Sequence, residues 1–551
     1  MKVLGLCDNH DSGAALISNG KIKSAISEER LDRVKLSRNF PFLSINKVFE
    51  MGKISMDDVD KIVVASKFTP NFVLRLFSCK YSKMKKSQFD YSLNLYFIYQ
   101  SLLKKIGLEK VDETLSKIVL QRKLKFKNIS LVDHHLAHAA AYYTSGLNKA
   151  LIITIDSMGD GVTLTVNIGQ GNSINRVYSQ SGFSAISLYY SRITEALGFT
   201  AIKHEGKVVG LASYGNPTPL LSCMKKMLHF KGPGFNLQNH FLKQGKKSGI
   251  FKEIKKHASK DVAAAAQLNL EQEVCKFVDF WVKKTGIKNL VVSGGLFANV
   301  KLNQRIHELE SVKSVYVFPH MGDGGLAFGA VMHELKPKPF RFKNLYFGPA
   351  YTNKEVKKEL ENNNIKHTFY KDIEKEVAKL LARGKVVARF KGAMEFGPRA
   401  LGNRSILYQP NDASVNDWLN KNLRRTEFMP FAPTVLEEYA EKCFKNIKGA
   451  EYSAKFMTIT FDCTDWMKKN CPGVVHVDGT ARPQIVSKKD NASYYKLIDE
   501  YRKLTGIPCI INTSYNMHEE PIVCTPSDAI KAFKESKLNF LAIESFLAEQ
   551  E

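Results

Sequence analysis

The alternation of short apolar stretches with helical ones is the feature that most limits how this chain can fold. Three short segments at the start of the chain are typical of strands: Val3–Cys7, Ala14–Ile17 and Lys21–Ile26. Asn19-Gly20 predicts a tight hairpin between the last two, because both turn residues tolerate positive φ. Strands and long helices then alternate, so we expect an α/β (α+β) protein with mixed sheets. The later predicted elements are strands 150–155, 290–293 and 314–318 and helix 261–285.

A proline-containing segment divides the chain. Leu335–Pro339 holds two prolines, which disfavour both a helix and a central strand. A new series begins after it, with predicted helices 354–362 and 373–383 and a strand at 386–390. A chain of 551 residues is long enough for more than one domain. We therefore expect two domains, residues 1–340 and 341–551.

Composition excludes several classes of protein. A hydrophobic fraction of 44% with 35 Gly and 18 Pro is typical of globular proteins rather than disordered, collagenous or coiled-coil ones. No apolar run approaches the roughly 18 to 20 residues of a membrane span, and Val3–Cys7 is too short for a signal-peptide core. Nine cysteines form no Cys-x-x-Cys pair, which argues against a disulfide scaffold or zinc ribbon. We expect a cytoplasmic protein.

Two segments carry most of the net charge of +27. Residues 70–130, which look mostly helical, hold 13 basic and 4 acidic residues. Residues 221–260 hold 10 basic residues and one acidic residue, so each segment carries +9. Such clusters attract polyanions, among them nucleic acid, anionic lipid and acidic polysaccharide. A solvated surface is the alternative, because lysine-rich faces are common without a ligand.

A histidine pair points to a metal ion. Asp133 suits a helix N-cap, and the Ala-rich run that follows supports a helix. On this helix His134 and His138 are four residues apart, so both imidazoles project from one face and can bind one ion. The pair needs further ligands, and a polar helix face with hydrogen-bonded histidines is the alternative.

Two acidic turns could supply those ligands. Asp156 ends the apolar strand Leu151–Ile155, and Asp323 lies in a Gly-rich turn after strand 314–318. Carboxylates at the carboxyl ends of strands, next to glycines, are typical of places where α/β proteins bind phosphates and metals.

Turns after two other strands could complete this site. Gly294-Gly295 opens toward a helix that holds Asn299, which suits close approach of backbone to phosphate. Asp8 and His10 follow the first strand. If that strand ends at the same cleft, these side chains converge with the histidine pair. His10 could then act as a general base, since an imidazole titrates near neutral pH.

A cationic cluster in the second half is typical of a site for a small phosphorylated ligand. Guanidinium groups hold phosphate and carboxylate oxygens bidentately. Asn512–Asn516 follows the predicted strand 509–511 and offers hydroxyls and amides. Each arginine alone could equally be a surface residue, so the prediction depends on their positions in Gly- and Pro-containing turns. The arginines are Arg399, Arg404, Arg424, Arg425 and Arg482.

Long motifs follow one another along almost the whole chain. They include His10-Asp11-Ser12, Glu28-Glu29-Arg30, Asp133–His138, Glu205–Gly215, Gly322-Asp323 and the segments 394–405, 430–433, 476–482 and 512–523. With these motifs the sequence resembles the O-carbamoyltransferases of the NodU/CmcH type. The resemblance implies an N-terminal ASKHA (actin/hsp70/sugar-kinase-like) domain, related to TsaD-type proteins, followed by a YrdC-like domain.

The resemblance also implies a two-step reaction. The YrdC-like domain would convert ATP, with Mg(II), and carbamoyl phosphate into carbamoyl-adenylate. The ASKHA-type domain would then transfer the carbamoyl group to a hydroxyl of a sugar-containing or natural-product acceptor, aided by Fe(II) or another divalent metal. An anionic glycan is one acceptor that fits the basic segments.

Matching the family motifs assigns roles to individual residues. The metal ligands fall on His134, His138, Asp156 and Asp323. The base and an acceptor contact fall on His10 and Asp8, with Lys35 as a further acceptor contact. Nucleotide-binding positions fall on Gly159, Lys207, Gly294, Gly295 and Asn299. Carbamoyl-phosphate contacts fall on Arg399, Arg424, Arg482 and Ser514.

The chain departs from the family in two places. Met429 stands where many members have an arginine, so either Arg425 compensates or donor binding differs. Residues 70–130 match no family signature, and we expect them to build acceptor recognition.

Two other functions remain open. A tRNA threonylcarbamoylation-type enzyme would use the same folds and explain the basic charge, but Phe-Gly-Pro-Arg-Ala-Leu-Gly at 396–402 is typical of the carbamoyltransferases. A non-catalytic nucleotide-dependent binding protein is disfavoured by the intact His/Asp set. Nucleic acid is therefore the less favoured partner, and a homodimer is compatible with the sequence.

Overall fold

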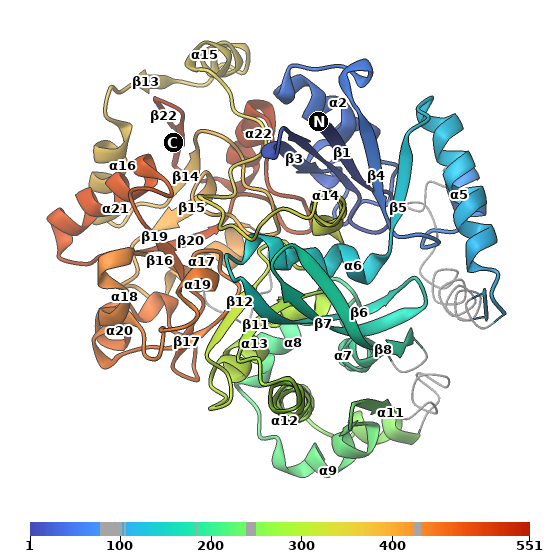
Figure 1. The fold of residues 1–551 in the computed structure, drawn as a ribbon. Helices are drawn as coiled ribbons and strands as arrows, with labels where there is room; N and C mark the ends of the chain where they lie inside the picture. Colours follow the sequence, from blue (N-terminus) through green and yellow to red (C-terminus); the bar gives the residue numbers. More distant parts are fainter. Residues whose placement is uncertain (78–101, 104–105, 183–184, 238–248, 424–430, 551) are drawn as a thin grey trace.

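Three large sheets organise the part of the chain that the computed structural model describes (Figure 1). That part comprises residues 1–77, 102–103, 106–182, 185–237, 249–423 and 431–550. Arg424, Arg425, Met429 and parts of both basic segments lie outside it. The sheets mix parallel and antiparallel pairs and are covered by helices, so the predicted mixed α/β fold is confirmed.

The first sheet has the strand order β3-β2-β1-β4-β5. Its first three strands form an antiparallel meander, and β4 and β5 run parallel to β1. Asn19 and Gly20 have φ values of 50° and 71°, as the predicted hairpin requires. The strands are β1 (Lys2–Cys7), β2 (Gly13–Ser18), β3 (Lys21–Ser27), β4 (Lys61–Ala65) and β5 (Ile129–Val132), with helices α1 (Glu29–Asp32), α2 (Phe42–Gly52), α3 (Phe72–Phe77) and α5 (Glu109–Leu124).

The second sheet repeats this arrangement. Its order, β8-β7-β6-β11-β12, again joins an antiparallel meander to two parallel strands, as the expected ASKHA-type architecture requires. The strands are β6 (Lys149–Gly159), β7 (Val162–Gln170), β8 (Ser173–Ser181), β11 (Asn289–Ser293) and β12 (Ser314–Val317). The hairpin β9 (Leu228–Lys231)–β10 (Gly234–Leu237) and helices α7 (Ile186–Ala196), α8 (Glu205–Ala212), α9 (Thr218–Met227), α11 (Gly249–Ile254), α12 (Ser259–Thr285) and α13 (Val300–His307) accompany it.

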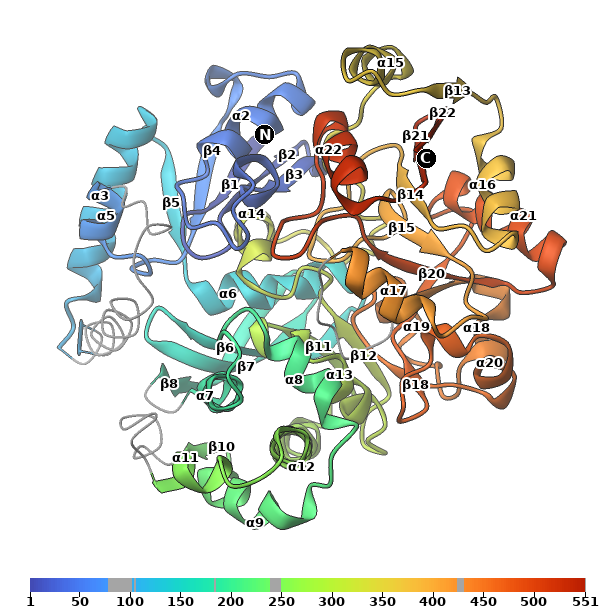
Figure 2. The same ribbon diagram turned by 180° about the vertical axis from the view of Figure 1, so that it is seen from behind.

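Helix α14 (Leu326–Leu335) lies between these two sheets (Figures 1 and 2) and packs on β1 and on α6 (His134–Ala139). The approach is close enough to exclude side chains. A Cβ at Gly5 would lie 2.0 Å from the Ala327 carbonyl oxygen, and one at Gly329 would lie 2.1 Å from that of Ala137. The backbones of β1, α6 and α14 are therefore in direct contact.

The second half of the chain forms an eight-stranded sheet of order β13-β22-β21-β14-β15-β20-β16-β19. Alternate residues of its strands face two separate cores. Val387, for example, packs with α16 (Ile373–Ala382) and α21 (Ala492–Thr505), and Ala388 packs with α22 (Pro526–Ser536). The strands are β13 (His367–Phe369), β14 (Val387–Phe390), β15 (Arg404–Tyr408), β16 (Ala432–Leu436), β19 (Gln484–Val486), β20 (Cys509–Ser514), β21 (Phe540–Ile543) and β22 (Phe546–Glu549).

The helices of this half agree with the predicted ones at 354–362 and 373–383. They are α15 (Asn353–Asn362), α16 (Ile373–Ala382), α17 (Val415–Asn422), α18 (Ala440–Cys443), α19 (Glu451–Ala454), α20 (Asp465–Asn470), α21 (Ala492–Thr505) and α22 (Pro526–Ser536), and a small sheet pairs β17 (Phe461–Asp462) with β18 (Thr480–Ala481).

The two halves pack extensively against each other. Phe342, Phe396 and Tyr452 are buried in the same core as residues of β1 and α6. Figures 1 and 2 both show α22 beside the first sheet, where Arg33 and Asp528 form an ion pair at 3.7 Å. The division near residue 340 stays a prediction. Among the described helices, none combines the length and apolarity needed to cross a membrane.

Candidate active site

The predicted histidine pair lies on the short helix α6. The side chain of Asp133 accepts a hydrogen bond from the backbone N–H of Leu136, as expected of an N-cap. His134 and His138 are both buried, with ring centroids 4.9 Å apart. The α-helix ends at Ala139, and a 3-10 turn continues it to Thr144.

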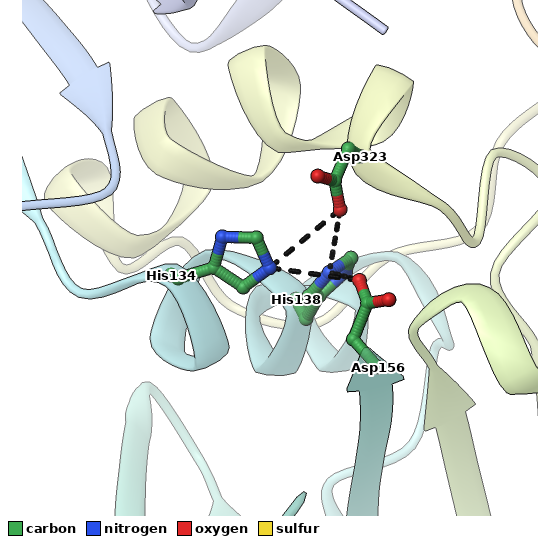
Figure 3. A group of neighbouring side chains, drawn as sticks. All are labelled: His134, His138, Asp156 and Asp323. Atoms are coloured by element: carbon green, nitrogen blue, oxygen red, sulfur yellow. Dashed lines mark hydrogen bonds and ion pairs between the residues drawn. The ribbon is translucent and has the colours of Figure 1, made fainter. Parts of the chain in front are cut away.

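Two carboxylates meet this pair (Figure 3). Asp156 lies in β6, and Asp323 begins the turn that leads into α14. His138 Nε2 lies 3.0 Å from Asp156 Oδ2 and 3.5 Å from Asp323 Oδ1. His134 Nε2 lies 3.6 Å from each of the same oxygens. The four ligand atoms all lie within 4.8 Å of one another, so the structure brings together the four residues that the sequence predicted as ligands.

The polar atoms of this group suit a divalent cation. His134 Nε2 and Asp323 Oδ1 are buried and have no hydrogen-bond partner. Burial and the nearby charge of Asp156 raise the pKa of Asp323 well above its ordinary value. Against the effect of burial, His134 and His138 hold the pKa of Asp156 well below its ordinary value. A cation would balance two crowded carboxylates, and two imidazoles with two carboxylates fit iron, manganese or zinc.

Asp8 and His10 follow β1 of the first sheet. Asp8 is buried, and both of its oxygens accept hydrogen bonds from Arg75 on α3, at 2.8 and 3.2 Å. Burial and the charge of Arg38 lower the pKa of His10 to about 3, although Asp156 opposes this. The His10 imidazole is therefore neutral at pH 7, as a proton acceptor must be. Sequence reasoning missed Arg75, which lies 67 positions from Asp8 in a segment without a family signature.

Two of the three predicted nucleotide-binding glycines lie against the ligand group, and the third lies against the residue before Asp156. A Cβ at Gly159 would lie 2.0 Å from the His134 ring, and one at Gly295 would lie 3.1 Å from Asp156 Oδ1. Gly294 has a φ of 106°, and its Cβ would meet the Ile155 carbonyl oxygen at 2.2 Å. These glycines allow the backbone to approach the ligand residues, and their contact with a nucleotide stays a prediction.

Two other predicted nucleotide-binding residues lie at the start of a helix and within a helix. Asn299 is the N-cap of α13, where its side chain accepts from the Leu302 N–H at 3.0 Å and exchanges hydrogen bonds with Gln267. Lys207 is buried within α8. Lys35, predicted to contact the acceptor, is half-buried and helps to lower the pKa of Glu519.

Three of the predicted carbamoyl-phosphate residues lie next to strand ends at the same end of the eight-stranded sheet. Ser514 ends β20, and antiparallel pairing sets that end beside the start of β15, which Arg399 precedes by five positions. Arg482 lies just before β19, whose first residue Gln484 donates to the Leu401 carbonyl oxygen at 2.9 Å. Strand register therefore sets Ser514 and the start of β19 at the same end of the sheet, and Arg399 lies in the loop that leads into β15 there. Arg424 lies outside the described residues.

Arg404 does not belong to this ligand cluster, contrary to the sequence prediction. Its side chain is fully buried at the start of β15, with the guanidinium 3.6 Å from the Phe390 ring centroid. It donates to the carbonyl oxygens of Lys391, Asn403 and Pro349. This arginine therefore stabilises the start of β15 instead of facing a ligand.

Glu395, which sequence reasoning missed, shapes the loop that carries Arg399. Its Oε1 accepts from the backbone N–H groups of Leu401, Asn403 and Arg404, at 2.8, 2.8 and 3.1 Å. A buried carboxylate that satisfies three amides fixes the backbone around it. Glu395 thus helps to fix the conformation of residues 396–403.

Two family models match the chain one after the other. The model described as Carbamoyltransferase N-terminus matches residues 2–332, and that described as Carbamoyltransferase C-terminus matches residues 378–550. The chain belongs to the carbamoyltransferase family. It is therefore a carbamoyltransferase, and both family regions contribute residues to the sites described above.

Relatives of this carbamoyltransferase cover it almost completely. It is 32% identical to an uncharacterized protein of Methanocaldococcus jannaschii over 99% of both chains. It is 30% identical to the Nodulation protein NolNO of Sinorhizobium fredii, over 98% of this chain and 79% of that protein. Among solved structures, full-length HypF in a phosphate- and nucleotide-bound form matches 61% of this chain and 46% of its own, at 13% identity and a TM-score of 0.35.

Proposed function

We propose that this carbamoyltransferase activates and transfers the carbamoyl group in two separate places. Carbamoyl-adenylate would form in a YrdC-like domain, residues 341–551, and transfer would occur in an ASKHA-type domain, residues 1–340. The observation that carries the proposal is the group His134, His138, Asp156 and Asp323. Its buried and unpartnered atoms, His134 Nε2 and Asp323 Oδ1, suit a cation.

The donor step would use the end of the eight-stranded sheet at which β15 and β19 begin and β20 ends. Arg399, Arg482 and Ser514 lie there, and positively charged and hydroxyl groups recognise phosphate oxygens. Carbamoyl phosphate would lose inorganic phosphate to water. The carbamate oxygen would then attack the α-phosphorus of ATP, bound with Mg(II), so that pyrophosphate leaves and carbamoyl-adenylate remains.

The transfer step would use His10. Its neutral imidazole would accept the proton of the acceptor hydroxyl as that oxygen attacks the carbamoyl carbon, and AMP would leave. When bound at the His/Asp group, Fe(II) or another divalent metal would supply positive charge toward the phosphate of the departing AMP. Enclosing the adenylate between the two halves would limit its hydrolysis.

The acceptor would be a hydroxyl-bearing molecule, with an anionic glycan as the class that the charge distribution favours. Residues 70–130 and 221–260 each carry +9. Arg75 neutralises Asp8, so this carboxylate offers little attraction for a cationic acceptor.

The two steps can be assayed separately. Purified protein with ATP and carbamoyl phosphate should release pyrophosphate without any acceptor. Mass spectrometry of candidate glycans should then show the mass gain of one carbamoyl group that depends on both substrates. Release of pyrophosphate only in the presence of tRNA would contradict the proposal and favour a threonylcarbamoylation-type reaction.

A further inference from the structure

The side chain of Arg75 on α3 connects Asp8, which follows β1, with Ser66 and Lys67, which follow β4. Besides its two bonds to Asp8, its guanidinium donates to the carbonyl oxygens of Ser66, at 2.8 Å, and Lys67, at 2.9 Å. The Arg75 and Asp8 side chains are 0% and 1% exposed. A planar guanidinium with four bonds to fixed partners leaves little freedom to any of them.

Ser66 carries this arrangement to the proposed metal ligand. Its hydroxyl lies 2.9 Å from Nδ1 of His134, the nitrogen on the far side of the ring from the ligand group. A hydrogen bond at one imidazole nitrogen sets the ring orientation and decides which nitrogen stays available as a ligand. The Ser66 contact therefore directs His134 Nε2 toward Asp156 and Asp323.

The backbone at Ser66 needs support to hold this position. Its φ of 71° is a left-handed conformation that residues other than glycine seldom adopt. The Ser66 N–H donates to the Val132 carbonyl oxygen at 2.8 Å, and Arg75 binds the Ser66 carbonyl from the other side. Asp160 adds bonds to the N–H groups of Lys67 and His134, both at 2.9 Å.

Helix α3, which carries Arg75, is also bonded to α5 within the basic segment 70–130. Lys123 on α5 donates to the Arg75 carbonyl oxygen, and Asp112 on α5 accepts from the Phe72 N–H at 3.4 Å. Arg75 thus belongs to the segment expected to recognise the acceptor and touches the segment that orients His134.

We infer that Arg75 is a positioning residue for carbamoyl transfer, which fixes Asp8 directly and His134 through Ser66. The inference rests on the proposed function of the His/Asp group as a metal site. It predicts that a side chain outside the ligand group controls how tightly that group binds a metal ion.

Titration of the metal-free protein with Co²⁺, followed by visible absorption, tests this without measuring activity. Ser66→Ala and Arg75→Lys should each weaken Co²⁺ binding by roughly 10-fold or more, as loss of an outer partner of a ligand does. Because both act on His134 along the same path, the double variant should be little weaker than either single one. Arg75→Lys keeps the positive charge beside Asp8 and so limits the risk of unfolding.

Arg176→Lys is the matched control. Arg176 pairs with Asp133 at 2.6 Å, next to the same helix, but neither residue contacts Ser66 in the described bonds. This variant should bind Co²⁺ as the unsubstituted protein does, and every variant should keep pyrophosphate release.

Four results would overturn the inference. Unchanged Co²⁺ affinity in Arg75→Lys would show that Arg75 does not position the ligand, and additive effects in the double variant would show two independent contributions. Equal weakening in Arg176→Lys would show general loosening of α6. If the unsubstituted protein binds no Co²⁺, or binds it equally in His134→Ala, the proposed metal site itself is wrong and the inference falls with it.

Discussion

Arg30 Nη2 donates to the carbonyl oxygen of Gly397 at 2.9 Å, across the boundary between the two family regions. Arg30 is buried on α1, and Gly397 lies two residues before Arg399. The loop proposed to bind carbamoyl phosphate is therefore held in part by the first half of the chain.

Arg30→Met should slow pyrophosphate release even though Arg30 lies far in sequence from the donor residues. Removing a charged hydrogen bond costs about 1.5 to 3 kcal/mol, or roughly 10- to 150-fold. A direct assay of pyrophosphate would measure the rate, with Arg305→Met as the control, which removes the pairs of Arg305 with Glu308 and Glu271. An unaltered rate in folded Arg30→Met would show that the loop holds its shape alone.

The donor residues themselves should matter without acceptor. Arg399→Ala should lower pyrophosphate release by roughly 30- to 150-fold, since one charge-assisted phosphate contact is worth about 2 to 3 kcal/mol. Ser514→Ala should have a smaller effect, because it removes a neutral hydroxyl. A normal rate in Arg399→Ala would remove this residue from the donor site.

Metal content should follow the four ligands. We expect His134→Ala combined with Asp323→Ala to lose the divalent metal found in the unsubstituted protein by elemental analysis. His229→Ala, on β9, should retain it because it leaves the ligand group intact. Equal metal content in both variants would contradict the assignment.

The pH profile of transfer should lack an acid limb near pH 6.5. Burial and Arg38 lower the pKa of His10 to about 3, so the imidazole stays unprotonated well below neutrality. For a lowered histidine pKa the unfolded state binds more protons, so this group costs stability as the pH falls from about 6.5 toward 3. Transfer should hold its rate between about pH 7 and 5; a loss at about pH 6.5 that is absent in pyrophosphate release would show an ordinary imidazole.

Salt should separate the two steps. Exposed charges act over about 8 Å at physiological ionic strength, so the KM of an anionic acceptor should rise with salt if the basic segments attract it. Pyrophosphate release should change much less. A neutral acceptor, or a KM independent of salt, would contradict the role given to the +9 segments.

The ligand group could be predicted because local rules place each member. Four-residue spacing on a helix aligned His134 with His138, and the ends of buried strands indicated Asp156 and Asp323. The same reasoning could not find Ser66, whose role depends on a left-handed backbone and on β4 pairing with β5. No sequence pattern predicts such a contact.

Arg404 shows where residue type misleads. Arginines near Gly and Pro turns were expected to face a phosphate, and for Arg399 and Arg482 this stays a prediction. Arg404 instead begins a strand in which every residue is buried, so its guanidinium must bind carbonyl oxygens. Whether an arginine faces a ligand or the core depends on strand pairing that spacing does not reveal.

The close contacts of α14 limit where the molecule can move. Its backbone contacts that of β1 at Gly5 and that of α6 at Gly329, and no side chain separates them at these points. The pieces that carry Asp8, His134, His138 and Asp323 must therefore shift as one body. Entry of an acceptor therefore cannot depend on spreading these pieces apart.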